Sequence, residues 1–115
     1  MCDLDGTIFQ HHGDTEGIQK KQPTVLRGVV NKFNEWELNG NYIILMTGRR
    51  ESLRKRTEEH LQAFGIPYDI LLMGVSSGER ILINDKSILG DDTCFAVNVE
   101  KDKGFEDISW GKLDL

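Results

Sequence analysis

Residues 2–8 read CDLDGTI, and this stretch decides how the rest of the chain is organised. If residues 1–4 form the end of a strand, the alternation of side chains along the strand points Asp3 and Asp5 to one side and Leu4 to the other. Gly6 then allows a sharp turn. Paired carboxylates at a strand end suit magnesium and a phosphate, because oxygen ligands match the metal and the metal offsets phosphate repulsion. We therefore expect a magnesium and phosphate site here.

Apolar runs alternate with helical patterns along the rest of the chain, which predicts an α/β fold. Continuous apolar runs are typical of strands buried on both faces, and apolar residues at three- and four-residue spacing predict helices. We expect strands at residues 1–4, 42–46, 68–73, 80–84 and 94–99, one helix from Pro23 to a stop at Asn39-Gly40, and a second helix over residues 51–64. The order predicts a doubly wound, open and mostly parallel sheet of about five strands, with helices on both faces and ligands at the carboxyl ends of the strands.

The segment 9–22 is polar, contains two glycines and shows no periodicity, which predicts a loop or short flap over the site. Its neighbouring histidines, His11 and His12, are read as solvent-exposed. Only two residues precede Asp3, whereas a central strand usually has about five or six. We therefore expect either that upstream residues are missing or that the first strand is unusually brief.

Four stretches in order resemble the motifs of the haloacid dehalogenase (HAD) superfamily of phosphohydrolases. Residues 3–7 (DLDGT) resemble its first motif, Asp-x-Asp-Gly-Thr after the first strand, and residues 45–49 (LMTGR) resemble the second. Arg80 or Lys86 would supply the third, and residues 81–85 (ILIND) resemble the fourth. The resemblance implies a single domain over residues 1–115 with a HAD-like Rossmannoid core and no cap, because residues 9–22 are too few to form one.

The resemblance also implies a magnesium-dependent phosphomonoester hydrolase that acts through an aspartyl-phosphate. Asp3 would be the nucleophile, and Asp5 would protonate the leaving oxygen and then activate water. The hydroxyl of Thr47 and the backbone amides from Gly48 onward would cradle phosphate oxygens where a strand meets a helix. The remaining assignments are Lys86, with Arg80 as the alternative, for the phosphate-binding cation, and Asp3, Asp5 and Asp85 for Mg²⁺.

The fourth motif departs from the family pattern, because its usual second acid is absent and Asn84 occupies the adjacent place. Either Asn84 substitutes as a neutral outer group or metal affinity is weaker than is typical of the family. The departure favours a rival class, a catalytically silent HAD-like module that binds phosphate or a partner protein. Retention of both Asp3 and Asp5 favours the enzyme. A phosphorylated receiver domain would need neither the Asp-x-Asp spacing nor the Gly-Thr turn.

Composition limits the remaining function classes. The chain has 115 residues, 38% of them hydrophobic, and a net charge of −5, which suits one core and no dedicated nucleic-acid surface. A local basic cluster nevertheless lies within residues 49–56, and it is read either as a solvated helix face or as an anion-attracting rim beside the site. No apolar run reaches the roughly 20 residues of a membrane helix, and we expect a cytoplasmic location and no membrane partner.

The expected partners are small phosphorylated molecules, such as a sugar phosphate or a nucleotide, or an exposed phosphorylated substrate. Without a cap the site is open, and a homo-oligomer is one way to close it. Cys2 and Cys94 form no disulfide framework and have no zinc-type spacing, so both are read as reduced, buried small residues.

Overall fold

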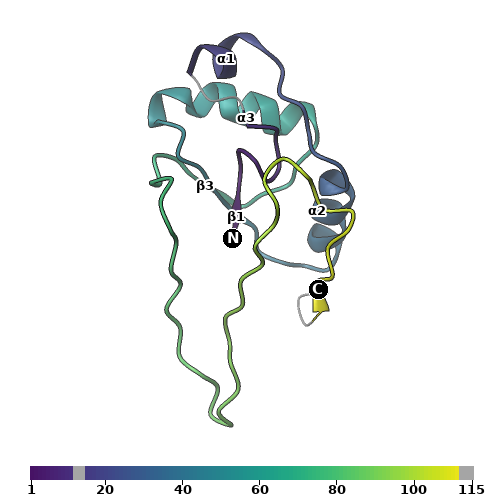
Figure 1. Ribbon diagram of the computed structural model, residues 1–115, viewed down its shortest axis with the longest axis vertical. Helices are drawn as coiled ribbons and strands as arrows, with labels where there is room; N and C mark the ends of the chain where they lie inside the picture. The colour runs from purple at the N-terminus through teal and green to yellow at the C-terminus, as the bar shows by residue number, and fades with distance from the viewer. Residues whose placement is uncertain (12–14, 112–115) are drawn as a thin grey trace.

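Three short parallel strands form the centre of the computed structural model, which describes residues 1–11 and 15–111 (Figure 1). They are β1 (Cys2–Asp3), β2 (Ile44–Met46) and β3 (Ile70–Leu72), in the spatial order β1-β2-β3. Leu45 lies at the centre of the register, opposite Cys2 on one side and Leu71 on the other. The strands expected around residues 1–4, 42–46 and 68–73 are therefore confirmed in shorter form.

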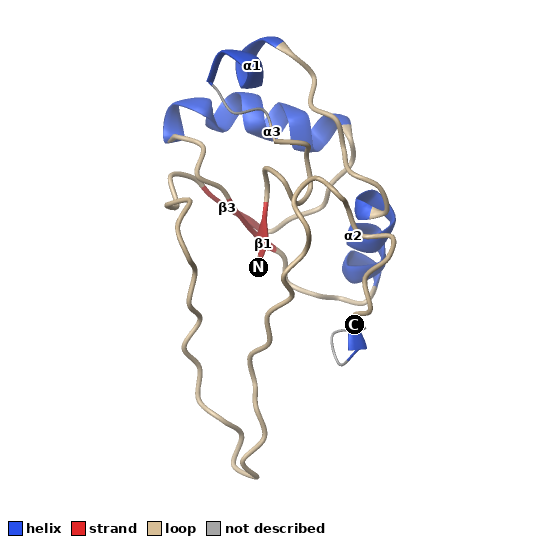
Figure 2. Cartoon of the chain, in the orientation of Figure 1, coloured by secondary structure: helices blue, strands red, loops and turns tan. Residues whose placement is uncertain are grey.

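Helices connect the strands, as parallel pairing requires. Helix α2 (Val29–Leu38) lies between β1 and β2, and a 3₁₀ turn, η1 (Glu51–Leu53), continues into α3 (Arg54–Ala63) between β2 and β3. Figure 2 shows a further short helix, α1 (Thr15–Lys20), beside α3. The described chain is thus a small α/β fold with an open parallel sheet of three strands.

The core fills the space between the sheet and the helices. Its buried members come from the strands and the turns beside them, from α2 and α3, and from the C-terminal segment: Leu4, Ile8, Phe9, Val29, Phe33, Ile43, Leu45, Leu61, Ile66, Leu71 and Phe105. Burial of each large apolar side chain contributes about 1.5–3 kcal/mol. The periodicity that predicted the second helix also places Thr57 and Leu61 on one face, and both are fully buried.

The C-terminal segment packs against α2 through aromatic rings. Phe105 stacks on Phe33 with ring centroids 6.4 Å apart, and Trp110 meets Trp36 edge-on at 5.4 Å. Aromatic contacts thus hold the C-terminal segment on α2. This packing matters for the site, because it fixes the chain that returns over the first turn.

Helix α2 begins six residues later than the sequence pattern predicted. The backbone of Gln10 donates to the carbonyl of Thr24 at 2.8 Å, and Leu26 donates to Ile8 at 2.8 Å. Gly28 then adopts φ 77°, a left-handed conformation that a helix interior does not contain. The expectation of helix from Pro23 onward was wrong, because this segment pairs with the chain after the first turn.

Part of the segment 9–22 is helical, where the sequence predicted a loop: α1 spans Thr15–Lys20. Phe9 is fully buried, and Ile18 of α1 is only 9% exposed. The sequence of this segment is polar and contains glycines, so it gave no periodic pattern from which the burial of Phe9 and Ile18 could be predicted. His11 is exposed as expected, whereas His12 lies outside the described residues.

Residues 80–99, here called the projecting arm, run away from the body of the fold and return (Figure 1). Neither the expected strand at residues 80–84 nor that at residues 94–99 is formed in the described chain. Ile81 is 83% exposed and Ile83 is 90% exposed. The apolar pattern predicted burial on both faces, but an extended segment becomes a strand only when a neighbour pairs with its backbone.

Across the described part of the chain, no helix has the length and apolar character needed to span a membrane.

We predict that Gly104→Ala destabilises the fold strongly. Gly104 is buried with φ +75°, and a methyl group there would lie 2.8 Å from the backbone nitrogen of Arg27 and closer still to its carbonyl oxygen. The cost should be roughly 1–3 kcal/mol for the clash, in addition to left-handed strain. Gly40→Ala is the matched control, since Gly40 has φ +79° and open space around it. Urea unfolding of both variants gives the comparison, and equal losses would contradict the close approach.

Candidate functional site

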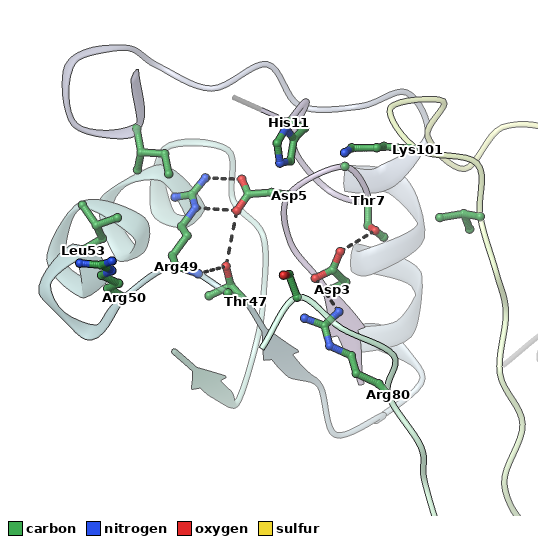
Figure 3. A pocket seen from close by; sticks show the side chains of 15 residues that line it. Asp3, Asp5, Thr7, His11, Thr47, Arg49, Arg50, Leu53, Arg80 and Lys101 are labelled. Carbon is green, nitrogen blue, oxygen red and sulfur yellow. Dashed lines mark hydrogen bonds and ion pairs between the residues drawn. The ribbon is translucent and has the colours of Figure 1, made fainter. Parts of the chain in front are cut away.

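A pocket of about 550 Å³ lies at the carboxyl ends of β1 and β2 (Figure 3). Asp3 and Asp5 line it from the first turn, and Thr47 and Gly48 line it from the turn after β2. Leu4, between the two acids, is fully buried in the core. The structure thus brings four of the sequence-predicted site residues to one cavity.

Asp3 is held from two sides. Its Oδ2 accepts a hydrogen bond from the Thr7 hydroxyl at 3.1 Å, and its Oδ1 pairs with Nη1 of Arg80 at 3.0 Å. The neighbouring thiol of Cys2 is no rival nucleophile, because burial, and secondarily the charge of Asp3, raises its pKa to about 12. The exposed reactive group at the end of β1 is therefore the Asp3 carboxylate.

Asp5 makes a two-pronged ion pair with Arg49. Nε of Arg49 donates to Oδ2 at 2.9 Å, and Nη2 donates to Oδ1 at 2.7 Å. The Arg49 side chain is 1% exposed and that of Asp5 is 19% exposed, so solvent screens this pair little. Bidentate geometry is the strong form of the interaction, and it fixes the plane of the Asp5 carboxylate.

Thr47 links the two turns and shapes the one that follows β2. Its backbone N–H donates to Leu72 at 3.0 Å, and its hydroxyl oxygen accepts the N–H of Arg49 at 3.0 Å. The same hydroxyl lies 3.5 Å from Oδ2 of Asp5, a long contact. Thr47 therefore stabilises the turn after β2 through its hydrogen bonds, and it also lines the pocket beside Asp5.

Arg49 belongs to a buried network that the sequence analysis missed. Besides Asp5, its Nη1 donates to the Thr57 hydroxyl at 3.1 Å and lies 3.3 Å from Nδ1 of His60. The sequence analysis placed Arg49 at the end of the second motif and in the basic cluster within residues 49–56, but it did not predict an ion pair with Asp5. The sequence pattern that could have indicated this network lies on α3, where the polar residues Thr57 and His60 share the buried face with Leu61. A buried guanidinium needs such partners, because an unpaired buried charge is very costly.

His60 is neutral in this network. Burial, followed by the nearby charges of Arg49 and Arg56, lowers its pKa from 6.5 to about 4, and Glu59 and Asp5 oppose the shift. A neutral ring leaves Nδ1 free to accept from Arg49. Its Nε2 is buried and has no hydrogen-bond partner in the described part of the chain.

Of the residues expected from the third and fourth motifs, Arg80 lies at the pocket, where the projecting arm begins, and the others lie further along the arm. Arg80 lines the pocket and pairs with Asp3, the place expected of the phosphate-binding cation. Lys86 lies on the arm and pairs with Asp92 at 3.3 Å, with both side chains largely exposed. Asp85 and Asn84 are also exposed on the arm. The side-chain amide of Asn84 donates a hydrogen bond to the Thr93 hydroxyl, which in turn donates to the backbone carbonyl of Asp85. The structure does not bring Lys86, Asp85 or Asn84 to the pocket.

A second missed residue, Lys101, reaches the pocket from the C-terminal segment. The N–H of Asp102 donates to the Gly6 carbonyl at 2.8 Å, and Oδ1 of Asp102 accepts the N–H of His11 at 2.8 Å. These bonds set the Lys101 side chain across Gly6, where an added Cβ would lie 3.1 Å from Lys101 Cγ. No motif marked Lys101, because its approach depends on a contact between residues 95 positions apart.

The pocket carries a charge opposite to that of the whole protein. Its lining contains two acids, Asp3 and Asp5, and four cations, Arg49, Arg50, Arg80 and Lys101, a formal balance of +2. The chain as a whole has a net charge of −5. A cavity with this local excess concentrates anions.

No three His, Cys, Asp or Glu side chains lie together as a metal-binding group within residues 1–11 and 15–111. The donor chemistry of Asp3 and Asp5 nevertheless suits Mg²⁺, since both are carboxylates. Each carboxylate also has about four lone-pair sites, and the hydrogen bonds from Thr7, Arg49 and Arg80 leave some of these unused. The two residues fit a magnesium site that needs further ligands.

Solved structures with a similar fold include chains of the Pnkp1/Rnl/Hen1 complex. One such chain is 32% identical with a TM-score of 0.57, and the match covers 70% of this chain and 29% of that one. A chain from a structure described as the Pnkp1/Rnl/Hen1 RNA repair complex gives the same identity and TM-score, with 69% and 26% coverage. The present chain thus spans less than a third of those two chains.

A crystal structure from Vibrio cholerae is also similar, with 20% identity and a TM-score of 0.51 over 76% of this chain and 80% of that one. At this identity the likeness shows the fold alone. No protein-family model matches the sequence, and neither does any curated protein. The class that fold and pocket define is therefore an α/β domain with an acid pair at the carboxyl ends of its strands.

We predict that His60 makes the fold less stable in acid. Between pH 6.5 and about 4 the unfolded state binds a proton at this position and the folded state does not, so stability falls as pH is lowered through that range. His60→Gln, which retains an acceptor for Arg49, should flatten the dependence. Urea unfolding at pH 7 and pH 5 measures it, with His11→Gln as the control. An unchanged slope in His60→Gln would argue against a neutral buried ring.

Proposed function

We propose that this chain is a capless HAD-type phosphatase domain that hydrolyses phosphomonoesters with Mg²⁺. The observation that carries the proposal is the convergence of Asp3, Asp5 and Thr47 on one pocket at the carboxyl ends of β1 and β2. Ligands of open α/β sheets bind at this edge. The positive lining supports an anionic substrate, and the motif resemblance supports phosphate as the anion.

In the first step, a carboxylate oxygen of Asp3 attacks phosphorus and forms an O–P bond, while the bond from phosphorus to the leaving oxygen breaks. The leaving oxygen takes a proton from Asp5, which enters this step in its protonated form and leaves it as a carboxylate. In the second step, Asp5 takes a proton from water, whose oxygen attacks phosphorus and breaks the bond to Asp3. Inorganic phosphate leaves, and both carboxylates return to their starting state.

The surroundings of each acid support this division of work. The Thr7 hydroxyl positions Oδ2 of Asp3, and Arg80, which contacts Oδ1, would place a positive charge beside the phosphoryl group being transferred. The Arg49 fork fixes the plane of the Asp5 carboxyl group, so that it faces the pocket in one orientation. Thr47 and the backbone after it supply donors for phosphate oxygens.

Asp3 and Asp5 would hold Mg²⁺, which when bound offsets phosphate charge and aligns the phosphoryl group with the nucleophile. Asp85 is the proposed third ligand, although the structure has it on the projecting arm. We propose that residues 80–84 and 94–99 complete a five-stranded sheet beside β1, which pairs only with β2 among the described strands. The exposed apolar side chains of the arm support this, because such a run gains stability when buried.

We predict that backbone amides of residues 81–83 and 95–97 exchange slowly with deuterium. Strands beside β1 would protect them, whereas the unpaired arm would exchange nearly as fast as an unfolded peptide. Amide exchange followed by NMR or mass spectrometry decides between the two, with residues 88–91 at the arm's tip as the fast-exchanging control. Fast exchange throughout residues 80–99 would remove Asp85 from the metal site.

The second candidate is a catalytically silent module that binds phosphate or a partner. The ion pair between Arg80 and Asp3 favours it, because it engages the nucleophile. The similar chains belong to a multi-protein complex, which supports a partner for this chain as well. One of these structures is described as an RNA repair complex, so an RNA end belongs among the phosphorylated substrates to test. A cytoplasmic location remains part of the proposal.

We predict that Asp3→Asn abolishes hydrolysis of an aryl phosphate while leaving the fold intact, because the variant keeps the volume and removes the nucleophile. Wild type should turn over with magnesium and stop when a chelator is added. Asp107→Asn, the same chemical change at an exposed site away from the pocket, is the control and should stay active. Turnover by Asp3→Asn at the wild-type rate would rule out the covalent route. Phosphate binding without any turnover would select the silent module.

A further inference from the structure

The pocket contains two cations whose charge no acid offsets. Arg49 is paired with Asp5, and Arg80 with Asp3. Arg50 and Lys101 also line the cavity, and neither makes an ion pair or hydrogen bond through its side chain in the described part of the chain. Figure 3 shows them on opposite sides of Asp5.

Lys101 is held in this place by its neighbours. Asp102 adopts φ 63°, a left-handed conformation unusual for a residue other than glycine, and its N–H and carboxylate bind Gly6 and His11. Gly6 itself has φ +89° and no side chain, which leaves room for the Lys101 stem. The fold therefore brings this ammonium across the turn that carries Asp5.

Arg50 is held by a different element. It directly precedes η1, and it extends from the turn in which Thr47 accepts the N–H of Arg49. Two cations from unrelated parts of the chain thus line one cavity on opposite sides of Asp5, although the protein is acidic overall. A single phosphate at Asp3 already has Arg80, Thr47 and the following backbone to bind it.

We propose that Arg50 and Lys101 recognise a second anionic group, so that the preferred substrate is a phosphate ester whose leaving group carries another phosphate. The inference rests on the proposed function for its reaction, because it names the substrate class of the same site. Sugar bisphosphates and nucleoside bisphosphates share this chemistry. A second phosphate matches the two uncompensated charges, and a charge-assisted contact contributes more than a neutral one.

Two matched ligand pairs test the proposal: fructose 1,6-bisphosphate against fructose 6-phosphate, and adenosine 3′,5′-bisphosphate against adenosine 3′-monophosphate. Calorimetric affinities for the wild-type protein in chelator give a readout that needs no turnover. We expect the second phosphate to tighten binding by about tenfold or more in at least one pair. The pair that responds identifies the source of the leaving group, sugar or nucleotide.

The double variant Arg50→Gln/Lys101→Gln should lose that preference. Lys103→Gln, an exposed lysine two residues from Lys101 and outside the pocket, should keep it. Raised salt should weaken bisphosphate binding more than monophosphate binding. Equal affinity for both members of both pairs, or a preference that survives in the double variant, would overturn the inference.

Turnover measured with magnesium separates this inference from the proposed function. Hydrolysis of monophosphates and bisphosphates with equal kcat/KM would keep the phosphatase and overturn the role of Arg50 and Lys101. Preferential bisphosphate binding without hydrolysis would keep the recognition site and contradict the phosphatase. Binding of none of the four ligands would overturn the recognition site directly.

Discussion

The buried ion pair between Arg49 and Asp5 is the interaction on which the rest of the site depends. It joins the turn after β1 to the turn after β2, and through Thr57 and His60 it also joins both turns to α3. A buried guanidinium is tolerated only with such partners, since breaking one contact leaves a charge with no solvent to compensate it. Three segments that are separate in sequence therefore have one arrangement that satisfies Arg49.

A second constraint acts from the far end of the chain. The aromatic packing of Phe105 and Trp110 on α2 anchors the C-terminal segment, and Gly104 lets it pass against the backbone of Arg27. The chain then meets the first turn through Asp102. The position of Lys101, on the side of the pocket opposite Arg50, therefore depends on core packing as well as on local sequence.

The projecting arm separates the acid pair from its expected third ligand. The body of the fold already holds both acids, because Thr7 contacts Asp3 and Arg49 contacts Asp5. From the arm only its first residue, Arg80, adds a contact to Asp3, so the position of the acids does not depend on where Asp85 lies. Such a division lets phosphate binding and metal binding be studied separately.

The sequence alone determined the α/β class, three strands of the sheet, the inward face of α3, and the convergence of Asp3, Asp5 and Thr47. It could do so because these features follow from periodicity and from residues adjacent in the chain. The late start of α2, the roles of Arg49 and Lys101, and the unpaired arm were decided by the tertiary structure. Each depends on a partner distant in sequence: residues 8–10 for the segment before α2, Asp5 for Arg49, and Gly6 for the turn at Lys101. Strand pairing, charge compensation and close backbone approach between distant segments leave no local pattern in the sequence.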